Sequence, residues 1–485
     1  MLLAPVSFIF PLLAGWMVVS VLFRVQARSS SLILLALIPG LGLGVFSCLI
    51  FILLLALGPS HGALVVIEIA LGSAVVLYQV RRKRTPQPMQ SHAPIALSAQ
   101  PRIIQILTLC FYIVAASSMI AFLILLVRRS HGEWDAWSIW NLKARYIFRG
   151  GAYWRDAFSS VLGFSHPDYP LLVPLNVAGS WILTGRETIA SSAAICFLFA
   201  ASTTALLVCS LRTLRSNAQG YLAGLLLLGS SLFIVEGPWQ YADVPAGFFY
   251  LAAAVSLALY DVTRQSDRRL FALAGLLASL AAWTKNEGML FFLALVVSRL
   301  VLGFSGQPVR TRIQKMMQFL AGSVPVVIVY VLFKALVAGA PNDILSAEPR
   351  VDRLFSLSRY IQVARAFGSE LWGFGGWSVS ILVLLVICLV ALGVAVDPET
   401  RPTIYTLLGT LCIVFVGLFS IFIITPYDLA WHLDSTLHRL LLQVWPTFLF
   451  TFFLIVRPPE ETLAAATQQN PKLPNPDQDR QQWAH

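Results

Sequence analysis

Long apolar runs separated by short polar segments recur along the whole chain. Most runs approach the ~20 residues that an α-helix needs to cross a bilayer. A shorter run, Leu171–Leu183, predicts a juxtamembrane helix at the membrane interface. The longer runs predict about thirteen transmembrane helices, over Pro5–Phe23, Ser31–Leu57, Ala63–Val80, Ile103–Val127, Thr188–Leu211, Tyr221–Val235, Val244–Tyr260, Leu270–Trp283, Met289–Leu302, Met316–Val337, Trp377–Val396, Thr403–Ile424 and Leu440–Val456.

The composition agrees with a membrane protein, because 58% of the 485 residues are hydrophobic and only 12% are charged. The net charge of +11 does not indicate nucleic-acid binding, since the basic residues collect in short loops between apolar runs. The six cysteines lie inside apolar runs without a CxxC pair, so we expect neither disulfides nor a thiolate metal site. The predicted fold class is an all-α polytopic membrane protein.

A basic linker divides the chain. Residues 1–80 hold three predicted spans, and the first lacks a basic flank before it, which favours a transmembrane helix over a cleaved signal. The linker, residues 81–102, begins Arg-Arg-Lys-Arg and is therefore predicted to be cytoplasmic. Residues 103–456 form the main transmembrane unit, and residues 457–485 are predicted to be a disordered cytoplasmic tail.

Counting spans from this linker places the longer polar segments on the outer face, at residues 128–169, 236–243, 339–376 and 425–439. Ionisable side chains close to the membrane are costly and commonly functional. Lys143 and Arg145 are predicted to face anionic headgroups. The candidate site residues on this face are Asp135, His166, Asp168, Asp243, Lys285, His432 and Arg439.

The order of these features resembles a known superfamily. An outer loop with an early Asp, "EWDAWSIWNLKARYIFRGG", leads to the turn "SHPDYPLLVPL", and an acid then opens the helix "YADVPAGFFYLAAAV". A "TK" ends the helix in "LLASLAAWTKNEGMLFF", and an Arg opens the last span in "HRLLLQVWP". Over residues 101–456 this order is similar to the GT-C integral-membrane glycosyltransferases of family 39, the PMT-like branch with protein O-mannosyltransferases and lipid A aminoarabinose transferases. The resemblance implies a GT-C-like helix bundle with outward-facing loops and juxtamembrane helices.

The implied reaction moves a sugar from a polyprenyl phosphate-linked donor to an envelope glycan, lipid or protein, with inversion. Phosphate is a good leaving group, so the site mainly needs a base for the acceptor hydroxyl and cations for the phosphate. We predict Asp135 as the base and Trp134 and Trp137 as an aromatic wall for the sugar. A structural loop acid and an interfacial aromatic belt are the respective alternatives. By the resemblance, Asp243 is a second catalytic acid; the alternative is a helix cap.

The remaining candidates are predicted to bind substrate. Lys285 and Arg439 would hold the donor phosphate, with snorkelling as the alternative. His166 and Asp168 would line the site or simply form a turn, and His432 is assigned to the same substrate-binding set. A divalent cation stays open, with Asp135, His166 and Asp168 as the nearest ligand set, although no HxxH or HExxH motif is present.

The sequence thus predicts a multi-pass glycosyltransferase of the plasma (bacterial inner) membrane, with its site facing outward. The alternative function is a transporter or flippase of lipid-linked sugars. A transporter would carry ionisable residues at mid-span positions, whereas here they cluster toward one face.

Overall fold

The computed structural model describes residues 5–22, 30–81, 101–263, 267–339, 344 and 351–469. Within these ranges the chain is helical, and its one β contact is an isolated bridge between Val394 and Val456. In the same ranges eight helices are long and apolar enough to cross a membrane, or ten if each of two bent helix pairs is one span. The protein is therefore an all-α, multi-pass membrane protein.

The apolar runs predicted to span fall largely within helices of different lengths, but Tyr221–Val235 is interrupted at residues 229–230 and Trp377–Val396 is α-helical only over Ile381–Leu392. The eight long ones are α2 (Ser30–Leu57), α4 (Arg102–Arg128), α7 (Ile189–Leu214), α10 (Asp243–Val262), α12 (Asn286–Ser298) extended by η7 (Arg299–Gly303), α13 (Val309–Leu336), α17 (Arg401–Ile424) and α18 (Leu429–Ile455).

Five further predicted runs correspond to bent or shorter helices. The helix α8 (Asn217–Leu228) bends by 65° into α9 (Ser231–Glu236) and η6 (Gly237–Trp239), and α15 (Leu357–Gly373) bends by 78° into α16 (Ile381–Leu392). The shorter helices are α1 (Ile9–Leu22), α3 (His61–Arg81) and α11 (Arg268–Thr284).

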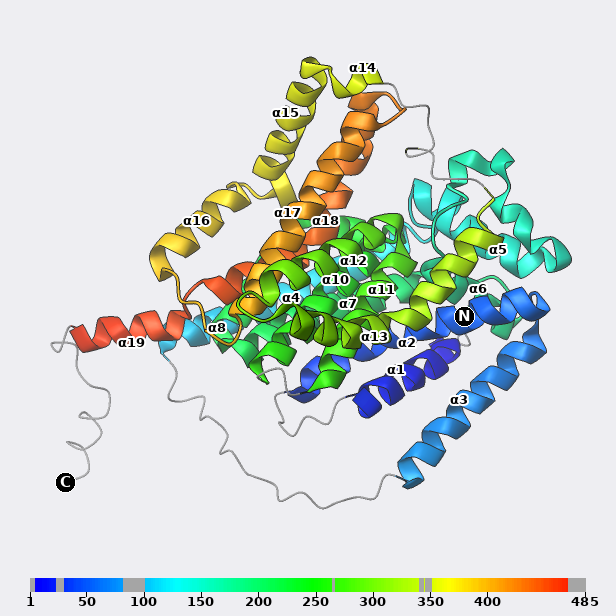
Figure 1. The fold of residues 1–485 in the computed structure, drawn as a ribbon, viewed down its shortest axis with the longest axis horizontal. Helices are drawn as coiled ribbons and strands as arrows, with labels where there is room; N and C mark the ends of the chain where they lie inside the picture. The colour runs from blue at the N-terminus through cyan, green and yellow to red at the C-terminus, as the bar shows by residue number, and fades with distance from the viewer. Residues whose placement is uncertain are drawn as a thin grey trace.

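The helix α10 lies at the centre of the bundle (Figure 1), packed against α7, α11 and α18. Nearly all of its side chains are buried. Small residues allow this close packing. A side chain at Gly247 would meet the backbone oxygen of Gln443 at 2.9 Å, so glycine there lets α18 approach the first turns of α10.

The N-terminal helices pack onto this core instead of standing apart. The helix α2 lies against α6 (Leu172–Thr184) and α7. The Trp283 indole of α11 donates a hydrogen bond to Ser47 Oγ of α2 at 3.0 Å. The helix α6, predicted to lie at the interface, is buried from Leu172 to Ile182 between α2, α5 (Asn141–Arg149) and α7. Its mostly apolar sequence on all sides accounts for that burial.

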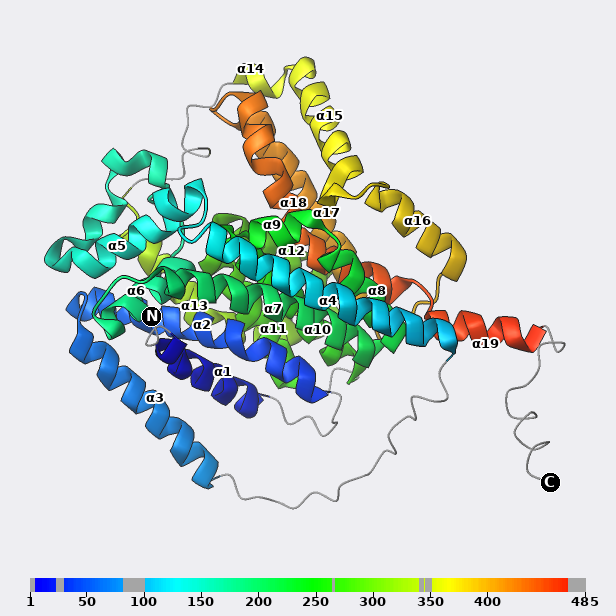
Figure 2. The same cartoon turned by 180° about the vertical axis from the view of Figure 1, so that it is seen from behind.

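Two groups of helices extend beyond one end of the bundle (Figure 2). One contains α5, η3 (Ala136–Trp140), η4 (Gly151–Phe158) and η5 (Ser160–Ser165). The other contains α14 (Val351–Leu354) and α15, which packs against α17 and α18. At the other end, α19 (Pro459–Gln469) leaves the bundle near α8.

The last long helix begins earlier than the predicted span Leu440–Val456. It starts at Leu429, where the Asp428 carboxylate accepts a hydrogen bond from the Trp431 backbone N–H at 2.9 Å and caps the helix. Arg439 therefore lies inside α18 instead of opening it. The polar residues before Arg439 had suggested a loop, but they occupy helical turns beyond the apolar part.

Candidate functional site

A buried carboxylate begins α10. Asp243 is 2% exposed, and its Oδ1 accepts hydrogen bonds from Lys285 Nζ at 2.9 Å and from Gln443 Nε2 at 2.7 Å. Lys285 lies between the end of α11 and the start of α12, and Gln443 comes from α18. The start of α10, the end of α11, the start of α12 and the middle of α18 thus meet at one carboxylate. The hydrogen bonds from Lys285 and Gln443 compensate for the water that the buried carboxylate has lost.

Arg439 joins Asp243 to a second carboxylate. Its Nη2 lies 2.5 Å from Asp135 Oδ2 and 3.4 Å from Asp243 Oδ2. The guanidinium carbon lies 4.4 Å from the centre of the Tyr241 ring, a cation–π contact. The Tyr241 hydroxyl in turn accepts a hydrogen bond from the Asp135 backbone N–H at 3.2 Å. We refer to Asp135, Asp243, Lys285 and Arg439 as the charged cluster.

The loop that carries Asp135 is attached to the loop before α10. Glu133 N donates to the Trp239 carbonyl at 3.2 Å, and Gln240 Nε2 donates to the Ser130 carbonyl at 2.9 Å. Gly132 has φ +74°, and a side chain there would meet the Trp239 oxygen at 2.4 Å. Only glycine suits this conformation and this approach. These contacts explain why two acids distant in sequence share one arginine.

The charged cluster keeps unused hydrogen-bonding capacity. Lys285 Nζ also lies 3.2 Å from Glu287 Oε1. Among the described residues, Arg439 Nε and Glu287 Oε2 are buried without a hydrogen-bond partner. Such orphaned buried atoms are rare in folded proteins, and they can mark a place where a ligand or water binds. The Asp135 side chain, 17% exposed, is the most accessible of the four members of the cluster, whereas that of Asp243 is 3% exposed.

Asp168 forms a neighbouring polar group with different partners. Its Oδ2 accepts a hydrogen bond from Asn286 Nδ2 at 2.7 Å, at the start of α12, and lies 3.6 Å from Lys334 Nζ near the end of α13. Lys334 also donates to the Asn286 side-chain oxygen at 3.0 Å. Because Asn286 follows Lys285 directly, this group adjoins the charged cluster through the start of α12.

Lys143 is buried instead of facing headgroups, contrary to the expectation from its position in an outer loop. Its exposure is 0%, and its Nζ donates to the carbonyls of Ser165 at 2.5 Å and His166 at 2.9 Å. Burial lowers the pKa of Lys143 to about 7, although nearby Asp168 and Asp135 favour the charged form. Arg145, also expected at headgroups, lies 3.5 Å from the Glu187 carboxylate.

His166 is held in an unusual conformation. Its φ is +48°, and its ring stacks on Tyr169 with the centroids 4.6 Å apart. A positive φ is uncommon outside glycine and marks a position that the surrounding structure fixes. Here Lys143 binds the His166 carbonyl, which fixes the turn that presents Asp168.

Trp134 and Trp137 lie on the surface beside Asp135. They are 61% and 42% exposed, and their rings form an edge-to-face pair with centroids 4.3 Å apart.

His432, which was predicted to bind substrate, does not lie in the charged cluster. It is buried against the rings of Phe422 and Tyr427, about two turns of α18 before Arg439, or roughly 10 Å along the helix.

Within the described residues, no group of three or more His, Cys, Asp or Glu side chains is placed to hold a metal ion. Asp135, His166 and Asp168, the nearest ligand set in the sequence, do not form such a group. Asp135 is paired with Arg439, and Asp168 is bound by Asn286 and Lys334. These partners occupy the carboxylates that a cation would need.

Several site residues were missed by sequence reasoning, namely Gln443, Tyr241, Asn286 and Lys334. Gln443 lies four residues after Arg439, on the same helix face, so a polar pair at helical spacing in an apolar span was an available signal. Lys334, near the end of an apolar span, offered a similar one. Nothing in the sequence distinguished Tyr241 from the other aromatic residues near the membrane.

Comparisons with protein-family models, with curated proteins and with solved structures find no match to this chain.

Proposed function

We propose that this protein is a membrane glycosyltransferase that moves a sugar from a polyprenyl phosphate-linked donor to an envelope glycan, lipid or protein. The observation that carries the proposal is the meeting of Asp135, Asp243, Lys285 and Arg439 at one end of the helix bundle. A lipid-linked sugar has its tail in the bilayer and its phosphate at the surface. An enzyme acting on it needs cations and a base at a membrane boundary.

Arg439 is the proposed phosphate ligand. Its Nε has no partner among the described residues and its Nη2 is shared between two carboxylates, so an entering phosphate can take both donors in a bidentate contact. Phosphate would thereby displace Asp135, whose side chain is the more accessible of the two acids. The displaced carboxylate then becomes available as a base. Lys285 balances Asp243 and adds positive charge nearby.

The chemical step is a single displacement. Asp135 accepts the proton of the acceptor hydroxyl while the hydroxyl oxygen of the acceptor forms a bond to the anomeric carbon. The bond from that carbon to the phosphate oxygen breaks, and the electron pair leaves with the lipid phosphate, which Arg439 stabilises. Attack opposite the leaving group inverts the anomeric centre. Trp134 and Trp137, exposed beside Asp135, offer a stacking surface for a sugar.

The proposal includes a GT-C-like arrangement of about thirteen passes, in which α1, α3, α11 and the two bent pairs complete the count. It also includes the plasma (bacterial inner) membrane, with the charged cluster facing outward. Basic loops at the opposite end of the bundle, among them Arg268, Arg310 and Arg401, support that orientation. No metal is required by the proposed step.

The test incubates purified protein in nanodiscs with a panel of radiolabelled polyprenyl phosphate-sugars and scores the release of lipid phosphate and the label on the acceptor. Asp135→Asn is the inactive control. A donor that is consumed by the wild type and not by this variant supports transfer. In a parallel assay with the protein in sealed vesicles, movement of intact donor across the membrane without release of phosphate would replace this proposal with the transporter alternative.

A further inference from the structure

A second buried polar group lies at the opposite end of α10 from the charged cluster. Asp261 is bound by the Arg299 guanidinium, with Nη1 2.8 Å from Oδ2, and by the Thr403 hydroxyl at 2.5 Å. From Asp243 to Asp261 the helix rises about 27 Å, close to the ~30 Å thickness of the hydrocarbon core. The two polar groups therefore fall at opposite boundaries of the membrane.

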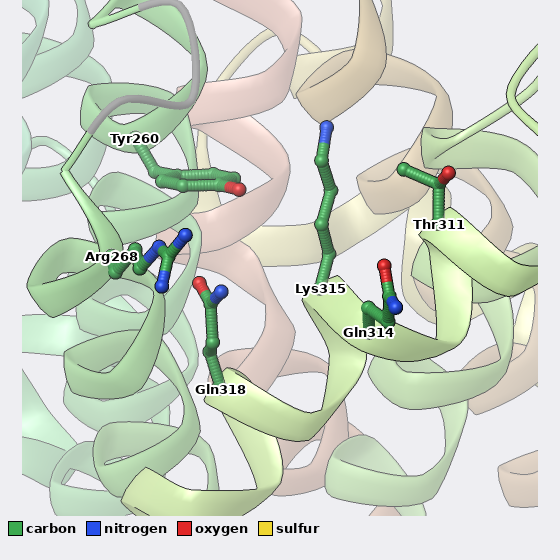
Figure 3. Close-up of a pocket in the computed structure, with 6 residues that line it drawn as sticks. All are labelled: Tyr260, Arg268, Thr311, Gln314, Lys315 and Gln318. Carbon is green, nitrogen blue, oxygen red and sulfur yellow. The ribbon is translucent and has the colours of Figure 1, made fainter.

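A cavity of about 220 Å³ opens beside this second group. It is lined by the end of α10, the start of α11 and the first turns of α13, through Tyr260, Arg268, Thr311, Gln314, Lys315 and Gln318. Figure 3 shows the Arg268 guanidinium, the Tyr260 hydroxyl and the Gln318 amide turned toward one space, with Lys315 on its other side. Its volume exceeds that of a single water by many times.

The lining has the chemistry of an anion site. Two of the six residues are cations and none is an acid. Two acids are adjacent in sequence to lining residues: Asp261 is bound by Arg299 and Thr403, and Asp267 accepts a hydrogen bond from the Arg269 backbone N–H at the start of α11. Hydroxyl and amide groups supply neutral donors, and Gln318 Oε1 is buried without a hydrogen-bond partner among the described residues. Such a side chain can rotate to present its NH₂ to a ligand oxygen.

An apolar stripe on α13 begins beside the cavity. Ile313 and Met317, neighbours of Gln314 and Gln318 in sequence, are 52% and 60% exposed, and Val324, Ile328 and Val331 continue the stripe along the helix. An exposed apolar stripe on a membrane-spanning helix faces lipid tails. A polar pocket that meets such a stripe at the membrane boundary matches a lipid, with its headgroup in the pocket and its chains along the helix.

We propose that this cavity binds the phosphate of an anionic phospholipid, from the leaflet opposite the charged cluster. Arg268 and Lys315 contact the phosphate oxygens, and Gln314, Gln318 and Thr311 bind the polar remainder of the headgroup. This inference does not depend on the proposed transferase activity. The lipid would hold α11 and α13 together at their inner ends.

The test measures binding of phosphatidylglycerol to the full-length protein in detergent by native mass spectrometry, with phosphatidylcholine as the neutral comparison. The double variant Arg268→Gln/Lys315→Gln should bind phosphatidylglycerol about tenfold more weakly or worse, since two charge-assisted contacts are lost. Arg310→Gln is the matched control. It removes one exposed cation from the same helix outside the cavity, and should leave binding unchanged.

Arg268→Gln alone, at an exposed position, serves if the double variant does not fold, and it should still weaken phosphatidylglycerol binding. If Arg310→Gln and the cavity variants bind phosphatidylglycerol equally well, the proposal is overturned, because the lipid would then be attracted to the basic surface in general and not to the cavity. Binding of inorganic phosphate is measured as a second ligand in the same assay. If it binds the cavity and phosphatidylglycerol does not, the ligand is a soluble phosphate and the lipid assignment is wrong.

Discussion

Replacing either acid of the charged cluster by its amide distinguishes a catalytic role from a role in stability. Asp135→Asn and Asp243→Asn are the same chemical change, and both residues contact the same Arg439 nitrogen. Their surroundings differ. The side chain of Asp135 is 17% exposed and has one ion-pair partner, whereas that of Asp243 is 3% exposed and is bound by Lys285, Gln443 and Arg439.

The expected effects on stability follow from these contacts. Asparagine at position 135 still accepts a hydrogen bond from Arg439, which keeps Asp243, so we expect a loss of about 1–2 kcal/mol. Asparagine at position 243 leaves Lys285, itself 3% exposed, with Glu287 at 3.2 Å as its remaining acid. Breaking a buried ion pair from one side costs about 3–5 kcal/mol. The melting temperature should therefore fall much further for Asp243→Asn.

For Asp135→Asn we expect a small loss of stability but a large loss of turnover. If it is the general base, Asp135→Asn should lower turnover by about 10²–10⁴ while the protein melts close to the wild-type temperature and binds donor. The assay measures melting temperature, donor binding and turnover separately in nanodiscs. Normal turnover by Asp135→Asn would refute the assignment of the base. Equal melting of the two variants would refute the reasoning about the cluster.

Three further predictions concern neighbouring groups and the orientation of the chain. The pKa of Lys143 is lowered to about 7 from an ordinary 10.5, so the unfolded chain binds more protons than the folded protein between these pH values. The free energy of unfolding should therefore rise from about pH 7 to about pH 9. The melting temperature should rise with it in the wild type, and Lys143→Met should flatten that rise. Arg439→Gln should weaken donor binding and destabilise by about 3–5 kcal/mol, measured by donor titration and melting, and unchanged melting would contradict the shared ion pair. In a cysteine-free background, an impermeant thiol reagent should label Asp434→Cys from outside and Arg82→Cys only after lysis, and the reverse pattern would invert the proposed orientation.

The periodic pattern of the sequence was enough to predict the fold class and the approximate places of the long apolar helices, but not α15 or the early start of α18. Apolar runs near 20 residues have few alternatives to a membrane helix, since backbone groups in lipid must be satisfied within the segment. The hydropathy pattern did not predict the bends after α8 and α15 or the burial of α6. An apolar helix that faces lipid and one that faces other helices have the same composition, so hydropathy does not separate them.

Candidate residues could also be named from the sequence, because acids and bases at membrane boundaries are few. Which of them meet was decided only by tertiary structure. Arg439 reaches both Asp135 and Asp243 because α18 is one long helix and because Gly247 lets it approach α10. Lys143 had the sequence surroundings of a surface lysine, but the fold of α5 buries it beneath the turn at His166. Sequence fixes which charges exist near a membrane, while packing decides which share a partner and which lose their water.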